Sequence, residues 1–294
     1  MLSISRLFMR SVQRVSRKML EQITPLILTY NEAPNIGRTL ERLRWARDIV
    51  VVDSFSQDET LEIISRFPQA RTFQRRFDTH GNQWNFGLQE TDIRSEWVLA
   101  LDADYLLTPE LIEELKALKP EADTKGYRAR FIYCINGQPL KGSAYPPVIV
   151  LYRRSVATYT QDGHTQRVEV KGEIKDLQSP ILHDDRKSLA HWIQAQSRYM
   201  KLEAEKLSRS GFRQLGWADR LRKTRLFAPF IIFLYCMFVK GAILNGRVGL
   251  YYALQRTFSE FLLSLYLIEN DLNVGQKGRG AEKAHDEVLE IELE

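Results

Sequence analysis

The chain has 294 residues, of which 44% are hydrophobic and 27% are charged, a composition that excludes a fully disordered protein and allows one large domain with an appendage. Its net charge of +5 is compatible with nucleic acid, anionic lipid or a phosphorylated substrate as partner. The cysteines, Cys134 and Cys236, have neither metal-ligand spacing nor a disulfide framework around them, which favours a reducing, cytosolic setting.

Residues 1–24 are expected to form a basic, amphipathic leader. Basic residues alternate there with apolar ones, and no acidic residue precedes Glu21. No uninterrupted apolar core precedes a small-residue cleavage site, so this stretch is not a secretory signal. It either lies on a membrane surface as an amphipathic helix, or it packs on the following domain or frays.

Short apolar runs alternate with helical stretches from Pro25 onward. Repeated strand and helix units of this kind predict a parallel, doubly wound sheet. Thr108 is a typical N-cap residue, and Pro109 follows it at the first helical position. The expected strands are 26–29, 49–52, 70–73 and 97–101, and the expected helices are 35–45, 59–67, 82–89 and the one that Thr108 caps.

The pattern changes after Gly126 to strand-rich segments at 127–135 and 148–153, joined through turn-forming residues at 136–139. The sequence therefore predicts an α/β domain over residues 25–187 with a mixed sheet. Its N-terminal half is expected to be parallel and its C-terminal half antiparallel.

A helical region is expected at 188–269, with helices at 189–208 and 249–268. Because amphipathic and apolar stretches dominate this region, we expect it to associate with a membrane. Residues 270–294 are polar and charged, and they are expected to form a flexible tail.

An apolar run at 226–239 lies between these two helices. It contains Pro229, ends at Lys240 and is shorter than the roughly 20 residues that a spanning helix needs. Arginines and Lys223 precede it, so we expect a helix in one leaflet with these cations on anionic head groups. A buried core helix is the alternative.

Acidic side chains follow three of the predicted strands. Glu32 follows the first strand, Asp53 closes the second, and Asp102 and Asp104 close the fourth. Ligands of open parallel sheets bind outside the carboxyl ends of the strands, so these residues are candidates for a site. No dinucleotide fingerprint or P-loop accompanies them. Asp102 and Asp104 are spaced to approach one divalent cation, Mg²⁺ or Mn²⁺, that also accepts diphosphate oxygens, although such a triplet is often only a solvated turn.

Three segments in this order and spacing resemble glycosyltransferase family 2. They are Leu-Thr-Tyr-Asn-Glu at 28–32, Val-Val-Asp-Ser-Phe-Ser-Gln-Asp-Glu-Thr at 51–60 and Leu-Asp-Ala-Asp at 101–104. The resemblance covers roughly residues 25–183. Within the family, this sequence is similar to the branch that builds lipopolysaccharide cores. It implies the GT-A fold, which is Rossmann-like, and a hexosyltransferase that inverts the anomeric carbon.

The resemblance also implies roles for individual residues. Tyr30 and Glu32 would line the base and ribose of the donor, and Asp53 would accept a hydrogen bond from the imide of a uracil. Asp102 would bind the nucleotide and the metal ion, and Asp104 would bind the metal ion. The donor is therefore expected to be a sugar linked to UDP.

Further polar residues are candidates for substrate or metal contacts, each with a structural alternative. Gln83 and Asn85 are expected to add contacts to the substrate or to cap a helix. His183 is expected to bind the metal or to cap structure together with the two aspartates that follow it. Arg167 is expected to bind phosphate groups of the acceptor or to be a solvated side chain.

The catalytic base is the least defined part of the site. Inversion needs a base that takes the proton from the acceptor hydroxyl, and Asp162 and His164 are the candidates. Thr165 stands where the family branch has a glutamate, and Tyr105 stands where a glutamate is common. This departure motivates an alternative, a membrane-associated pseudoenzyme or scaffold that binds nucleotide sugar without transfer.

The sequence thus predicts a metal-dependent, inverting glycosyltransferase. It would move a sugar from a nucleotide diphosphate donor to a lipid-linked or lipopolysaccharide-core glycan. The expected location is the cytoplasmic face of the bacterial inner membrane, as a peripheral or monotopic protein. Nucleic acid is not an expected partner, because no recognised binding module is present.

Overall fold

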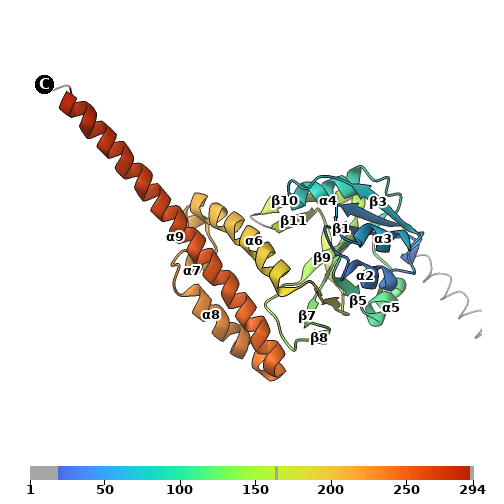
Figure 1. Ribbon diagram of the computed structural model, residues 1–294. Coiled ribbons are helices and arrows are strands. Elements are labelled where there is room, and N and C mark those ends of the chain that lie inside the picture. Colours follow the sequence, from blue (N-terminus) through green and yellow to red (C-terminus); the bar gives the residue numbers. More distant parts are fainter. Residues whose placement is uncertain (1–18, 163–164, 292–294) are drawn as a thin grey trace, which may run out of the picture. The chain divides into compact units, whose positions relative to one another are not determined.

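The computed structural model describes residues 19–162 and 165–291 of the chain. The chain divides into two compact units, the first ending at Ser188 and the second beginning at Leu189 (Figure 1). The leader predicted at 1–24 falls largely on residues outside the described ranges, so its membrane role stays a prediction.

A seven-stranded mixed sheet forms the centre of the first unit. Its neighbours β1 with β2, β1 with β4, and β2 with β3 are parallel, which confirms the parallel half predicted from the alternating runs. The strand order is β12-β6-β9-β4-β1-β2-β3. The strands are β1 (Ile23–Thr29), β2 (Ile49–Asp53), β3 (Ala70–Gln74), β4 (Trp97–Asp102), β6 (Thr124–Ala129), β9 (Val148–Arg153) and β12 (Glu173–Asp176).

Both faces of this sheet are covered, because successive side chains of a strand point to opposite sides. Val51 packs into the core with α2 (Ile36–Arg42), α3 (Thr60–Ser65) and α5 (Pro109–Ala117), whereas Val50 and Val52 pack with α4 (His80–Gln89). Figure 1 shows α4 on one side of the sheet and α2 and α3 on the other.

Two local features fix the helices on the sheet. A Cβ at Gly87 of α4 would lie 2.7 Å from Leu26 Cδ1 of β1, so a larger residue here would have to displace the Leu26 side chain. Thr108 caps α5 as predicted, since its hydroxyl accepts a hydrogen bond from the Leu111 amide at 3.2 Å. Leu111 and Leu115 then point into the core.

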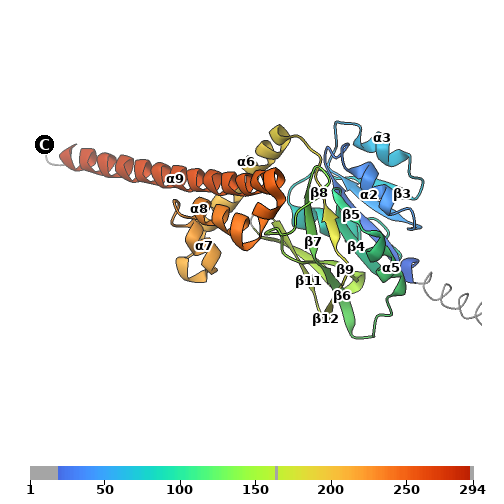
Figure 2. The same ribbon diagram turned by 90° about the horizontal axis from the view of Figure 1, so that it is seen from below.

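The strand-rich segment predicted at 127–135 is confirmed and contains two strands, because the chain changes sheets near Arg130. Its first part belongs to β6, and its second part is β7 in a separate four-stranded sheet of order β5-β13-β7-β8, seen from below in Figure 2. A two-stranded hairpin is also present. The strands concerned are β5 (Tyr105–Leu107), β7 (Phe131–Ile135), β8 (Gln138–Pro139), β10 (Ala157–Asp162), β11 (Thr165–Val170) and β13 (Ile181–His183), and a 3₁₀ turn, Arg154–Val156, precedes β10.

The predicted antiparallel half is only partly antiparallel. β9 runs antiparallel to β4 and β6, but β12 is parallel to β6 and β13 is parallel to β7. The long excursion through β9, β10 and β11 separates these pairs in the chain. It brings the later strands back in the same direction as their partners, which a tight hairpin cannot do.

The second unit is helical. Met200, Ala204 and Leu207 of α6 pack against Leu263 and Leu267 of α9 in its core. Figure 1 shows α6 and α8 alongside α9. The elements are α6 (Leu189–Arg209), a 3₁₀ turn (Phe212–Gln214), α7 (Trp217–Arg222), α8 (Ala228–Leu234), a π turn (Tyr235–Val239), a 3₁₀ turn (Ala242–Asn245) and α9 (Gly246–Ile291).

The tail predicted from residue 270 belongs to α9 as far as Ile291, and its flexibility stays a prediction. The sequence after Gly280 is rich in Glu and also contains Ala and Leu, residues that have high helix propensity.

The apolar run of the second unit faces outward for much of its length. Phe227 and Phe230 are 62% and 61% exposed, whereas Ala228, Pro229 and Cys236 are buried, so a core helix does not describe it. Among the described residues, no single helix has the length and apolarity to cross a membrane. Two consecutive helical segments, Ala228–Val239 and Ala242–Asn273, have that length and apolarity when they are taken together, and they are bent by 67°.

Candidate active site

The carboxyl ends of β1, β2 and β4 bring the predicted acidic residues to one edge of the sheet. Leu28 of β1 is in register with Asp102 of β4, and Thr29 is in register with Asp53 of β2. Asp104 follows two residues after Asp102, just before β5 begins. The edge is therefore the place where this fold concentrates negative charge.

Asp53 is fully buried and holds the loop that follows β2. Its carboxylate accepts hydrogen bonds from the Thr29 hydroxyl at 3.1 Å, the Ser56 amide at 3.0 Å and the Gln74 amide group at 3.3 Å. Both oxygens are thus engaged within the protein. Its predicted contact with the donor base stays a prediction, and Tyr30, 42% exposed just beyond β1, lies at the same edge.

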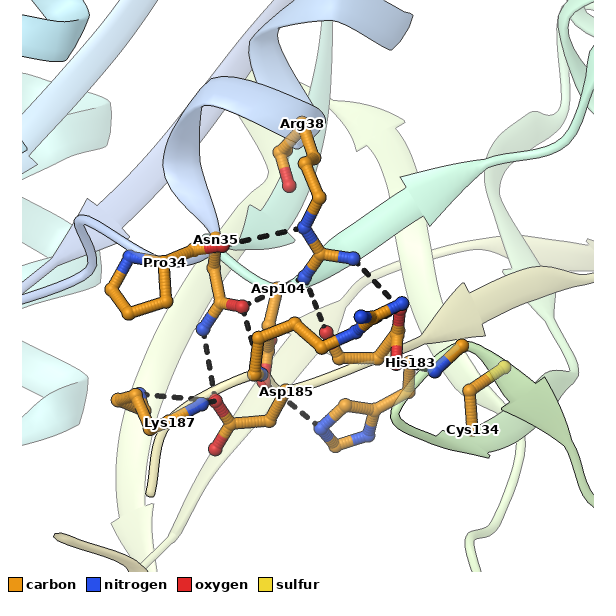
Figure 3. Close-up of polar contacts among 12 residues, drawn as sticks. Pro34, Asn35, Arg38, Asp104, Cys134, His183, Asp185 and Lys187 are labelled. Carbon is orange, nitrogen blue, oxygen red and sulfur yellow. Dashed lines mark hydrogen bonds and ion pairs between the residues drawn. The ribbon is translucent and has the colours of Figure 1, made fainter.

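Asp102, Asp104 and His183 form the acidic centre of the site. Burial and the charge of Asp104 raise the pKa of Asp102 to about 6. Burial would also raise the pKa of Asp104, but His183 and Lys187 lower it below its usual value. His183 Nε2 lies 3.1 Å from Asp104 Oδ2 (Figure 3). The centre therefore keeps one carboxylate ionised and gives it a histidine partner.

An aromatic box fixes the ring of His183. The rings of Tyr105, Tyr133 and Tyr145 lie 5.1, 4.7 and 4.9 Å from it, edge-on in each case. The Tyr105 and Tyr145 hydroxyls are also hydrogen-bonded to each other. Within the part of the chain that the structure describes, His183 Nδ1 is buried without a hydrogen-bond partner.

The segment after β13 lies against the start of α2. Arg38 Nη1 donates to Asp184 Oδ2 at 2.7 Å, and Asp184 also accepts from the Gly137 amide at 2.8 Å. The Asn35 side-chain amide donates to Glu32 at 2.8 Å. It also donates to Asp185 at 2.9 Å (Figure 3). These contacts place the 184–187 segment beside Asp104 and fix the loop between β1 and α2.

Glu32 and Lys187 form an ion pair in this cluster, with Nζ 2.5 Å from Oε1 and side chains only 13% and 16% exposed. Burial raises the pKa of Glu32 to about 7 against the opposing effect of the ammonium group. Burial alone would lower the pKa of Lys187, but Glu32, Asp185 and Asp104 raise it. Lys187 is therefore a cation among several carboxylates. It keeps its charge over a wider pH range than Glu32 does.

Gln83 and Asn85 on α4 have structural contacts. Gln83 is buried, donates to Ser54 at 3.0 Å and accepts from Arg75 at 2.7 Å. The Asn85 amide donates to the Tyr159 carbonyl at 2.8 Å and accepts from the Tyr159 amide at 2.9 Å, which clamps α4 to β10. Their predicted substrate contacts stay predictions.

Asp162 and Arg167 lie on the hairpin of β10 and β11. Arg167 Nε is 2.8 Å from Asp162 Oδ2, and the arginine is 75% exposed. The other candidate base, His164, lies outside the described residues. The structure therefore adds an ion pair to Asp162, and its role as the base stays a prediction.

The donor set partly fits a divalent cation. Across residues 19–162 and 165–291, no three His, Cys, Asp or Glu side chains are arranged to hold a metal ion alone. Mg²⁺ usually takes only one or two protein carboxylates and completes its octahedron with water and phosphate oxygens. Neighbouring ligands of such an ion are about 3 Å apart, which matches the 3.1 Å between Asp104 and His183. These two residues would hold the ion, with Asp102 behind them.

Sequence reasoning missed Asn35, Arg38 and Lys187, and it gave Asp185 only a capping role. The run His-Asp-Asp-Arg-Lys at 183–187 was a usable signal, because five ionisable residues occur in a row, beginning with the last residue of β13. Their partners on the loop before α2 are about 150 residues away, and only the fold shows that pairing.

The mixed α/β sheet, with acidic residues where its parallel strands end, has the GT-A-like arrangement that the sequence predicts. Residues 26–162 match the model of Glycosyl transferase family 2, so this part of the chain is similar to a family 2 glycosyltransferase domain.

Several relatives that are named as glycosyltransferases match this chain over most of their length. An uncharacterized glycosyltransferase of Rickettsia conorii is 23% identical over 274 residues, 88% of this chain and 94% of the relative. The lipopolysaccharide core biosynthesis glycosyltransferase LpsC of Rhizobium meliloti is 27% identical over 256 residues, 82% of this chain and 89% of that protein. Among solved structures, S. aureus TarS 1–349 in complex with UDP-GlcNAc has a TM-score of 0.45 and 14% identity, covering 86% of this chain and 92% of that one.

Proposed function

We propose that the chain transfers a hexose, with inversion, from a nucleoside diphosphate donor to a lipid-linked or lipopolysaccharide-core glycan. The observation that carries this proposal is the convergence of Glu32, Asp102, Asp104 and His183 at one edge of a domain similar to those of family 2. Buried carboxylates that repel one another favour a bound cation, and a diphosphate brought with it completes the charge balance.

The donor is proposed to bind across this edge. Tyr30 is exposed at the end of β1 and offers a ring for the base, while Glu32 lies at the start of the loop where a ribose would sit. Asp104 and His183 would hold Mg²⁺ or Mn²⁺, which when bound neutralises the charge of the leaving diphosphate. Lys187, held in place by its ion pair with Glu32, would lie close to the negative charge of the same diphosphate. We infer UDP as the nucleotide, on the sequence resemblance.

The acceptor is proposed to lie near the β10–β11 hairpin. Asp162 is the proposed base that takes the proton from the acceptor hydroxyl, and Arg167 holds that carboxylate in place and presents a cation to acceptor phosphates. The relative LpsC supports a lipopolysaccharide-core acceptor. Such an acceptor is anchored in the cytoplasmic leaflet of the inner membrane, where we place the protein as a peripheral or monotopic enzyme.

The proposal is tested by release of nucleoside diphosphate from a panel of UDP- and GDP-sugars, with purified core glycolipid as acceptor. We expect release only with one donor, dependent on Mg²⁺ or Mn²⁺ and abolished by EDTA. Release without added metal after EDTA treatment would remove the metal from the proposal. Donor binding by calorimetry without any release, across all donors and acceptors, would favour the pseudoenzyme instead.

A further inference from the structure

The second unit has an apolar turn at its surface, which we call the elbow and define as residues 238–244. The elbow joins the π turn after α8 to the start of α9. Phe238, Val239, Ile243 and Leu244 are 62%, 72%, 49% and 67% exposed. Turns that face water are normally polar, and a contiguous exposed apolar patch indicates a binding surface.

Glycines fix the bend of the elbow. Gly241 and Gly246 have φ of +70° and +54°, which other residues rarely adopt. A Cβ at Gly249 would lie 1.8 Å from the Ala242 carbonyl oxygen, so this first turn of α9 approaches the elbow as only glycine allows. The 67° bend between the two helical arms is therefore specified by the sequence.

The apolar surface continues from the elbow along both arms. The rings of Phe230 on α8 and Phe261 on α9 lie 5.7 Å apart, so the surfaces of the two helices adjoin. On α9 the exposed apolar residues recur at helical spacing on one stripe. They are Leu250, Leu254, Phe258, Phe261 and Leu265.

The sequence around this surface is predominantly basic. Seven Arg or Lys residues and no Asp or Glu occur from Arg220 to Ser259. Acidic residues outside this stretch compensate two of them, because Arg222 pairs with Asp219 and Glu260 and Arg225 pairs with Asp271. The other five leave the stretch with a net positive charge. Two copies of the chain brought together through this surface would repel each other. An anionic lipid surface matches both properties, since head groups attract the cations and acyl chains take the apolar side chains.

The length of the first arm, Ala228–Val239, argues against a segment that crosses the membrane. Ala228–Val239 has 12 residues, about 18 Å of helix, against the ~30 Å of a hydrocarbon core. Lys240 stands at the bend, where a spanning segment would have an apolar residue. We propose that the elbow inserts, tip first, into the interface of one leaflet of an anionic membrane and does not cross it. This inference rests on the second unit alone and is independent of the transfer reaction.

Site-specific labelling tests the insertion directly. Leu244→Cys carries an environment-sensitive fluorophore, and the matched control is Leu202→Cys on α6, a residue 46% exposed in the same unit. Cys134 and Cys236 are buried, so the label reports the introduced thiol. With phosphatidylglycerol vesicles we expect a blue shift and quenching by lipids spin-labelled near the head group at position 244 only. Quenching only by lipids labelled deep in the core, or no response at 244, would overturn the proposal.

A pair of variants separates lipid from other occupants. Val239→Asp with Leu244→Asp should reduce flotation with anionic vesicles by at least about tenfold, whereas Leu202→Asp should leave it unchanged. Both proteins keep residues 1–24, so the leader does not explain a difference. Equal flotation of the two variants contradicts the proposal. A fluorophore response at 244 that grows with protein concentration without vesicles contradicts it too, because it identifies a second copy as the occupant.

Discussion

The two units depart from the usual distribution of side chains in opposite directions. The first unit buries charge, with Glu32, Asp104 and Lys187 only 13%, 12% and 16% exposed. The second unit leaves apolar side chains such as Val239 and Leu244 in water. Buried charge and large exposed apolar patches are both costly and both informative, because each requires a partner. Here they point to a charged ligand for the first unit and to a lipid surface for the second.

The same contrast predicts what substitutions do. Charges in the first unit hold one another, so removing one leaves a buried partner uncompensated. The apolar side chains of the elbow contact water, so polar replacements there cost little stability. Changes in the first unit should therefore affect activity and stability, and changes at the elbow should affect only location.

The largest effect is expected for Asp104→Asn. The variant keeps the shape of the side chain but loses the charge that we propose holds the cation, so turnover should fall by about a hundredfold or more. Nucleoside diphosphate release at saturating donor measures this. Asp176→Asn, which removes an exposed carboxylate paired with Arg128, is the control and should be fully active. A wild-type rate with wild-type metal dependence in Asp104→Asn would show that the assignment is wrong.

Lys187→Ala is expected to have the largest effect on stability. It leaves Glu32 buried without its cation, which costs about 3–5 kcal/mol in the free energy of unfolding. Urea unfolding followed by tryptophan fluorescence measures the change. Lys175→Ala, at an exposed pair with Glu121, is the matched control and should hardly change the midpoint. If the two variants unfold at the same urea concentration, the pair is not the stabilising element we describe.

Asn85→Ala sharpens the distinction between a structural and a substrate contact. The substitution leaves the amide and carbonyl of Tyr159 unpaired at the junction of α4 and β10, at a cost of about 1–3 kcal/mol for each unsatisfied group. We expect lower stability and unchanged donor affinity, measured by urea unfolding and calorimetry. The reverse result, unchanged stability with weaker donor binding, would restore the substrate role predicted from the sequence.

The smallest stability effect is expected for Arg167→Ala. Its ion pair with Asp162 is exposed, so the free energy of unfolding should change by less than about 0.5 kcal/mol. The KM for a phosphorylated acceptor should rise a few-fold, while the KM for the donor stays the same. Arg128→Ala, another exposed arginine, provides the comparison. No change in either KM would mean that Arg167 is a solvated side chain.

Much of the fold could be predicted because its signals are local. Alternating apolar runs gave the parallel strands, and Thr108 with Pro109 gave the start of α5. The break between β6 and β7 could not be predicted, since residues 127–135 contain no glycine or proline to mark it. Pairing with β12 and β13, which come later in the chain, decides which sheet each half joins.

The candidate site also contains some residues that could be predicted from the sequence and others that could not. Asp53, Asp102 and Asp104 were predicted because each follows directly from a strand end. The pairing of Lys187 with Glu32 could not be, because 155 residues separate them and only the return of the chain past α2 joins them. The apolar run at 226–239 was predicted to lie in one leaflet, but the exposed elbow that follows it could not be predicted, since exposure is a property of packing and not of composition.

The central claim is that the acidic edge binds a nucleoside diphosphate together with a divalent cation. Calorimetric titration of UDP into the wild-type protein and into Asp104→Asn, each with Mn²⁺ and with EDTA, tests it most directly. The account predicts that EDTA weakens UDP binding to the wild type by at least about tenfold and has no further effect on the variant. Wild-type binding of equal strength in Mn²⁺ and in EDTA would contradict it.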